Sequence, residues 1–285
     1  MLPLASLAEL RVGPILTVGG ILVTMALVAW IETAIPLHTR GRWNRAHLGP
    51  NLALTFLGFT TNALFNGALL MALGWLDHER FGFMHLVALR PAISLAVTVL
   101  MLDFGFYVAH VALHKVPGFW RFHQVHHSDP AVDVTTTIRQ HPGESVIRYA
   151  FLAAFAVVLG ASPAAFGVYL LCSALNGLLE HANVRVPPWL DSLLSLITTW
   201  PNMHKVHHSR VATETDTNYG NLFSFWDRIF LTFTRARNGT NIIYGLDGFD
   251  VSVKQSTAGL LAMPFWRTNR ENPSARPRSD VAAHH

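Results

Sequence analysis

The chain has 285 residues, of which 51% are hydrophobic and only 13% are charged. A soluble globular protein has about 25% charged residues, so this composition, with a mean hydropathy of +0.32, excludes an ordinary soluble domain and indicates an integral membrane protein. The net charge of +4 is better explained by membrane topology than by a nucleic-acid-binding patch, and no nucleic-acid partner is expected. The one cysteine excludes a disulfide framework.

Three charge-poor stretches in the first part of the chain are long enough to span a bilayer, at residues 15–31, 48–76 and 91–114. The third contains one carboxylate, Asp103, and a charged group inside the membrane is a functional hypothesis by default. Asp103 shares a helical stripe with His110 but lies about 10 Å from it along the axis. We therefore expect Asp103 to support a ligand histidine rather than to bind metal itself. An ion pair with an arginine elsewhere is the alternative.

Eight of the sixteen histidines lie in two short windows. The first window reads His110-Val-Ala-Leu-His114 and then His123-Gln-Val-His126-His127, and the second reads His204-Lys-Val-His207-His208. Spacings of three and four residues place imidazoles on one face of a helix. Neutral imidazole is the commonest metal ligand among protein side chains. So many nitrogens exceed what one tetrahedral metal can use, so the pattern predicts a two-metal site.

Residues 149–179 carry no charge and are interrupted at Gly160-Ala-Ser162-Pro163, a helix stop followed by a new helix start. Two full spans would need about 40 residues, so we expect a helical hairpin that dips into the bilayer and returns to its starting side. The returning helix carries His181 back to the histidine windows. Residues 189–200 and 222–234 are candidates for helices at the head-group level; core packing is the alternative for the first of them.

The predicted fold class is all-α. We expect an integral membrane helical bundle of about three spans plus a re-entrant helical hairpin, with a histidine-rich helical cap on one side. Residues 1–267 would form one membrane-embedded domain and residues 268–285 a disordered polar tail. The distribution of lysine and arginine favours a cytoplasmic cap, in a bacterial inner membrane or an ER-type membrane.

The order HxxxH, HxxHH, HxxHH on a hydrophobic chain resembles the fatty acid hydroxylase superfamily, which includes sterol desaturases and alkylglycerol monooxygenases. Further matches are Arg139-Gln-His141-Pro-Gly-Glu144, Glu180-His181-Ala-Asn183, Asp216-Thr-Asn218-Tyr219-Gly220 and Trp226-Asp227-Arg228, so that the resemblance covers residues 103–235.

The resemblance implies a membrane di-iron oxygenase, in which the ten metal ligands would be His110, His114, His123, His126, His127, His141, His181, His204, His207 and His208. Some members have a further histidine where this chain has Gly177. We expect Asn183, Asp216 and Asn218 to orient imidazoles by accepting their distal N–H groups. Local turn capping is the alternative for Asp216 and Asn218.

The expected reaction is the O2-dependent hydroxylation or desaturation of an alkyl, sterol or related lipid, with two iron ions as cofactor and zinc as a possible substitute. The sequence contains no flavin or nicotinamide fingerprint, so the electrons would come from a separate protein. The main alternative is a zinc-dependent membrane hydrolase, although its usual HExxH glutamate is missing here. A metal transporter would carry its ligands at mid-bilayer, and a bis-histidine haem protein would not need HxxHH.

Overall fold

The computed structural model describes residues 4–39, 46–235, 242–249 and 251–266, and it describes the side chains of the first helix from Thr17 onward. The polar tail expected at 268–285 lies outside these residues. Within the described ranges the secondary structure consists of helices and three isolated bridges, with no β-sheet. The predicted all-α fold class is therefore confirmed.

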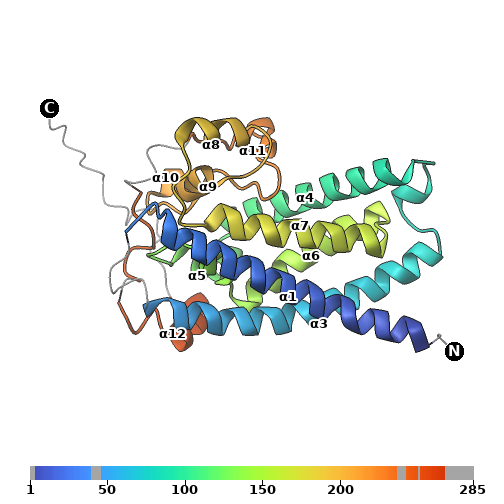
Figure 1. The fold of residues 1–285 in the computed structure, drawn as a ribbon, viewed down its shortest axis with the longest axis horizontal. Coiled ribbons are helices and arrows are strands. Elements are labelled where there is room, and N and C mark those ends of the chain that lie inside the picture. Colours follow the sequence, from blue (N-terminus) through green and yellow to red (C-terminus); the bar gives the residue numbers. More distant parts are fainter. Residues whose placement is uncertain (1–3, 40–45, 236–241, 250, 267–285) are drawn as a thin grey trace.

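Five long helices form the body of the molecule and run along its longest dimension (Figure 1). They are α1 Leu4–Ala34, α3 Leu48–His78, α4 Pro91–Lys115, α6 Pro142–Leu159 and α7 Pro163–His181. All five are long and apolar enough to cross a membrane. Large apolar side chains on α1 and α3, such as Trp30, Leu64 and Met71, are 68%, 73% and 73% exposed. Lipid contact accounts for such exposure, which is rare on soluble monomers.

The hairpin predicted from the charge-free stretch is formed by α6 and α7. It turns at Gly160, whose φ of +71° and close approach to Phe81, where a Cβ would lie 2.4 Å from the carbonyl oxygen, leave room only for glycine. The Ser162 hydroxyl then caps α7 by accepting from the Ala165 amide at 3.3 Å. Helix α6 begins at Pro142, earlier than expected, because proline suits the first helical position. That the hairpin dips rather than crosses stays a prediction.

Short helices gather at the end of the bundle where α4 and α7 finish (Figure 1). They are α5 Pro117–His127, η2 Val134–Ile138, α8 Pro188–Leu194, α9 Pro201–His207, α10 Ala212–Thr215, α11 Phe225–Ile229, α12 Thr257–Ala262 and η4 Met263–Phe265, while η1 Phe83–His85 follows α3. The two segments expected at the head-group level contribute α8 and α11, which are shorter than the ranges predicted for them.

A buried polar network holds the end of α5 against α3. The Arg139 guanidinium donates to the carbonyl of Val125 at 2.9 Å and to the Asn51 side chain at 2.8 Å. The His47 ring lies 3.0 Å from Asp129 and 3.3 Å from Asp133. Burial opposes a charge on His47, but the two carboxylates outweigh it and raise the pKa of His47 to about 9. The network fixes the position of the double histidine that ends α5.

Candidate metal centre

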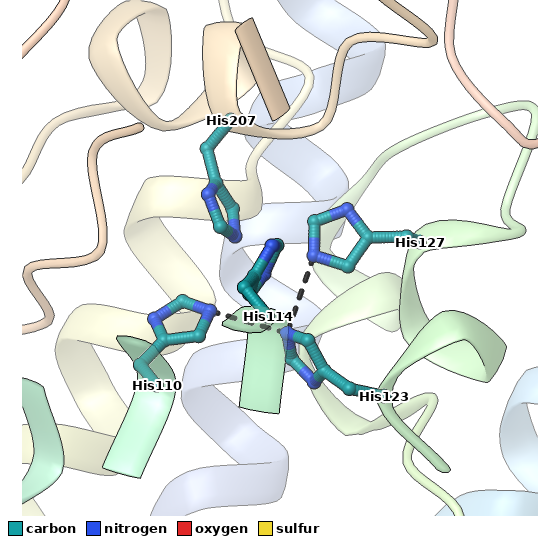
Figure 2. Close-up of side chains that lie close together, drawn as sticks. All are labelled: His110, His114, His123, His127 and His207. Carbon is teal, nitrogen blue, oxygen red and sulfur yellow. Dashed lines mark hydrogen bonds between the residues drawn. The ribbon is translucent and has the colours of Figure 1, made fainter. Parts of the chain in front are cut away.

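Nine of the ten predicted ligand histidines lie in two adjacent groups at the end of the bundle where α4 and α7 finish. Within each group, one ring nitrogen from every residue lies within 4.8 Å of the others. Group one consists of His110, His114, His123, His127 and His207, and Figure 2 shows these five rings pointing toward one another. Group two consists of His126, His181, His204 and His208. The groups touch, since the rings of His127 and His208 stack with centroids 4.6 Å apart.

Each HxxHH motif is divided between the two groups. His123 and His127 belong to group one while His126 belongs to group two, and the second motif divides in the opposite sense, with His207 alone in group one. Helical geometry explains the division. At 100° per residue, the first and fifth positions lie about 40° apart around the helix, whereas the fourth lies about 100° from the fifth. One short helix therefore supplies two neighbouring sites.

Four helices, α4, α5, α7 and α9, end at the centre and supply its histidines from their last two turns or, for His208, from the C-cap. Both helices that carry HxxHH, α5 and α9, begin with a proline at the first helical position. The C-terminal end of a helix carries a partial negative charge from its unpaired carbonyl groups. Four such ends directed at one place favour bound cations there.

Hydrogen-bond acceptors lie beside the Nδ1 atoms of five of the nine rings. His110 donates from Nδ1 to the Tyr219 carbonyl at 2.8 Å, because a carbonyl oxygen can only accept. The same geometry joins His181 to the Gly177 carbonyl at 2.8 Å and His207 to the Thr217 carbonyl at 2.7 Å. These contacts fix the tautomer that leaves the Nε2 lone pair free for a metal.

Carboxylates take the same place beside the other two of these five rings. Asp216 Oδ1 lies 3.3 Å from Nδ1 of His114, and Glu144 Oε1 lies 3.1 Å from Nδ1 of His123, a distance that allows an ion pair although the two atoms do not form a hydrogen bond. The remaining four rings, for which no Nδ1 acceptor is found among the described residues, are those of His126, His127, His204 and His208.

The centre is shielded from solvent. All nine rings are buried, His110 being the most exposed at 6%. Burial, and after it the neighbouring histidines, holds the pKa well below its usual value in four rings outside the long helices: His126, His127, His204 and His208. Neutral imidazole is the form that binds metal, so the site is ready to bind at neutral pH.

The distances between nitrogens also fit metal binding. In group two, Nε2 of His181 lies 3.1 Å from Nε2 of both His126 and His204. In group one, Nε2 of His123 lies 3.2 Å from Nε2 of both His110 and His127. Two Nε2 atoms at this distance either share one proton in an N–H···N hydrogen bond or direct their lone pairs at a common cation. A set of nitrogen donors of this kind suits iron, zinc and copper.

Among the predicted supporting residues, only Asp216 contacts a ring of either group. Asp103 does not reach a histidine; its carboxylate accepts from the Leu222 and Phe223 amides at 3.0 and 3.1 Å and from the Trp226 indole at 3.0 Å. It thereby holds the segment that follows Tyr219. Asp103 therefore touches no histidine directly, and its support of a ligand histidine stays a prediction.

Asn218 and Asn183 also bind backbone rather than imidazole. Asn218, with φ +56°, donates to the Met203 and Thr234 carbonyls at 3.0 and 2.9 Å, so the turn-capping alternative describes it better. It follows Thr217, the residue that accepts from His207. Asn183 pairs with the backbone of His38 through contacts of 3.1 Å in both directions.

His141 lies outside both groups. Its Nδ1 accepts from the Gly143 amide at 2.9 Å and its Nε2 lies 3.3 Å from the Leu261 carbonyl. The ring is therefore the N-cap of α6, which occupies both of its nitrogens. The structure does not support His141 as a metal ligand.

Several supporting residues had no signal in the sequence. Carbonyl groups such as those of Tyr219 and Gly177 carry no residue-type signature, so only the fold reveals them. Asp227, which lies in a quoted motif, accepts from the Tyr219 and Gly220 amides at 2.7 and 2.9 Å and so positions the carbonyl that orients His110. Glu180 places a carboxylate oxygen 3.8 Å from Nε2 of His204.

A cavity of ≈590 Å³ leads from the bundle to the centre. Its wall includes ring atoms of both groups, among them His110 and His181. Away from the centre it is lined by α1, α3 and α7, where Val18 and Leu171 are each 39% exposed. The cavity extends along α7 from His181 to Gly167, about 21 Å at 1.5 Å per residue. An elongated apolar molecule from the membrane fits this shape.

The fold and the site describe a helical protein with five candidate membrane spans and two adjacent histidine groups that could hold metal ions, beside a cavity lined by the long helices. Residues 95–232 match the family model described as fatty acid hydroxylase. This part of the chain is therefore a fatty acid hydroxylase domain, as the resemblance predicted.

Named relatives include lipid hydroxylases. The chain is 32% identical over 182 residues to the ornithine lipid hydroxylase OlsE of Rhizobium tropici. The aligned region covers 63% of this chain and 53% of that protein. It is 32% and 33% identical to the alkylglycerol monooxygenases of Caenorhabditis elegans and Homo sapiens, over 50% of this chain and 28% and 31% of those proteins. The chain thus spans about half of the first relative and less of the others. No solved structure matches it.

Proposed function

We propose that this protein is an O2-dependent lipid hydroxylase in which the two histidine groups each hold one iron ion. The observation that carries the proposal is that histidines of both groups line a cavity whose other lining residues lie largely on the long apolar helices. When bound and reduced, a pair of irons supplies the activation of O2 that an unreactive C–H bond requires.

The ligand assignment follows the two groups. Group one offers five imidazoles and group two offers four, and no ligand role is proposed for His141. The four helix ends and the neutral rings favour a cation, while the partners of Nδ1 hold the rings in a fixed orientation.

The protein's other contribution is to position the lipid and exclude water. The apolar lining along α1, α3 and α7 receives an alkyl chain, and the aromatic rings of Trp120 and Tyr219, with centroids 5.1 and 5.0 Å from that of His114, close group one on its other sides. A dry site protects a reactive oxidant from side reactions.

The finer assignments are part of the same proposal. Hydroxylation is favoured over desaturation because the names of the relatives above are those of a hydroxylase and monooxygenases. Electrons would come from a separate protein, and the histidine groups would lie on the cytoplasmic side of a bacterial inner membrane or an ER-type membrane.

The test combines metal analysis with oxygen isotopes. Protein purified from iron-supplied cells should contain about two irons per chain, one for each group. If zinc is found instead, anaerobic iron loading precedes the assay, because overexpression can load the wrong divalent metal. The loaded protein is then incubated with a chemical reductant, ¹⁸O₂ and a lipid extract of the host membrane, and the lipids are analysed by mass spectrometry.

Incorporation of ¹⁸O from O₂ into a lipid hydroxyl group supports the proposal. One zinc per chain, with label entering only from H₂¹⁸O, would replace it with the zinc-dependent hydrolase. His208→Ala, which leaves group two with three imidazoles, should abolish the product. His78→Ala, which removes an exposed histidine at the far end of α3, is the matched control and should leave product formation unchanged.

A further inference from the structure

A polar cluster interrupts the apolar wall of the cavity beside the metal centre. It consists of Arg148 and Tyr149 on α6 and of Asn62 and Asn66 on α3, all of which line the cavity. Tyr149 donates its hydroxyl hydrogen to the Asn66 side chain at 2.7 Å. Polar groups within a membrane-spanning bundle are costly, and by default they mark a site of function.

The guanidinium of Arg148 is short of acceptors. Its Nη1 atom lies 3.6 Å from Glu144 Oε1, which is longer than a hydrogen bond, and the group stacks over the Phe106 ring at 4.7 Å. Among the described residues no hydrogen bond to this side chain is found. A guanidinium has five N–H donors, and that of Arg148, whose side chain is 25% exposed and lines the cavity, leaves most of them without a partner among the described residues.

A second polar atom of the cluster also lacks a partner. Oδ1 of Asn62 is buried and makes no hydrogen bond with the described residues. A buried amide without a partner costs about 1–3 kcal/mol, and oxygen and nitrogen of an amide exchange places by a simple flip. Arg148 and Asn62 together therefore offer donors to one small group rich in oxygen atoms.

The cluster lies close to the oxidising site. The same oxygen, Glu144 Oε1, is 3.6 Å from Arg148 and 3.1 Å from the ring of His123 in group one. In contrast, the wall farther from the centre is apolar and opens toward lipid beside Val18 and Leu171. A molecule bound here has its polar end next to the metals and its hydrocarbon chain toward the membrane.

We propose that the cavity binds a lipid through a carboxylate or phosphate group held by Arg148, so that the oxidised carbon is one adjacent to the head group. Guanidinium matches both anions in geometry and charge. The choice of the oxidised carbon rests on the hydroxylase function proposed above, whereas the recognition of the anion does not.

Binding is measured without turnover, on the full-length, metal-loaded protein in detergent with no reductant. Four probes share one sixteen-carbon chain and displace tritiated palmitate: palmitate, hexadecyl phosphate, hexadecanol and hexadecyltrimethylammonium. The two anions should bind at least tenfold more tightly than the other two. A comparable affinity for all four overturns the proposal, and this ranking needs no variant. A preference for only one of the anions identifies which head group the site accepts.

Variants then locate the site. Arg148→Gln should weaken the binding of the two anions by about 10- to 100-fold, as expected for losing hydrogen bonds to a charged group. The affinity for hexadecanol should stay unchanged. Arg148→Lys keeps the charge and should retain the preference. Arg90→Gln, an exposed arginine before α4 at the opposite end of the bundle, is the matched control. An unchanged anion preference in Arg148→Gln, with normal metal content, overturns the assignment.

The last measurement identifies the oxidised carbon in the product of the active enzyme. The hydroxyl group should appear next to the head group of a bound substrate, and mid-chain or terminal oxidation would contradict the proposed orientation. Anion preference without any oxidised product would count against the hydroxylase function alone, because anion recognition would remain established.

Discussion

The division of each HxxHH motif predicts that two adjacent histidines support different metal ions. His207 is one of five members of group one, and His208 is one of four members of group two. His207→Ala leaves four imidazoles in group one, whereas His208→Ala leaves only three in group two. We therefore expect His208→Ala to lose the metal of group two while keeping that of group one. His207→Ala should retain both metals.

The magnitude follows from the number of ligands. A structural zinc site with four ligands binds with about 10–16 kcal/mol, or about 2.5–4 kcal/mol per ligand, which corresponds to about 10²- to 10³-fold in affinity. Group two should lose affinity by that factor in His208→Ala. Group one should lose less in His207→Ala, because a fifth imidazole adds less than a fourth.

The assay uses zinc as a redox-inert probe. Protein loaded with zinc is dialysed against graded chelator concentrations, and bound zinc is measured by elemental analysis. At a concentration that leaves two zincs on the wild type, His208→Ala should retain about one and His207→Ala close to two. Equal losses in the two variants, or a larger loss in His207→Ala, would refute the assignment of the groups. His78→Ala should behave like the wild type.

Three further predictions concern the residues around the centre. The pKa of His47 is raised from 6.5 to about 9, so the stability that its charge contributes is complete below pH 6.5 and is lost as the pH rises through 9. The free energy of unfolding should therefore fall by about 3 kcal/mol between pH 6 and pH 10. His47→Gln should abolish this pH dependence. Asp103→Asn places an amide N–H₂ against backbone donors and should lower the free energy of unfolding by about 2–5 kcal/mol, so unchanged thermal stability would contradict its role in holding the loop. Glu144→Gln removes the charge beside His123 and should weaken zinc binding in group one about tenfold, measured by the same dialysis, with no change in group two.

The long helices and the histidine windows were predictable because each depends on a local pattern. A charge-free stretch of sufficient length can only be satisfied in lipid by a helix or a closed barrel. Spacings of three and four residues fix which side chains share a helix face. The return of His181 to the centre also followed from sequence, because the Gly160–Pro163 break predicts a hairpin of two helices.

The partners of the histidines were not predictable because they depend on contacts between distant segments. The Tyr219 carbonyl meets His110 across 109 positions of sequence, and nothing in the residue type marks it. Asp103 and Asn183 are both buried, but Asp103 binds backbone amides and an indole and Asn183 binds backbone groups, so neither contacts an imidazole. His141 resembled a ligand by motif, yet the start of α6 already engages both of its nitrogens.

The position of the centre at one end of the bundle follows from these physical requirements. Group one and group two need several helix ends, because only there do histidines from different helices converge with negative dipole ends toward a cation. Substrate has to arrive from lipid, so the cavity must run along the apolar interiors of α1, α3 and α7. A carboxylate shared between the ring of His123 and the guanidinium of Arg148 joins the two requirements. Glu144 thus lies beside both a candidate metal ligand and the arginine proposed to bind the lipid's polar end, and we expect the two functions to be coupled through it.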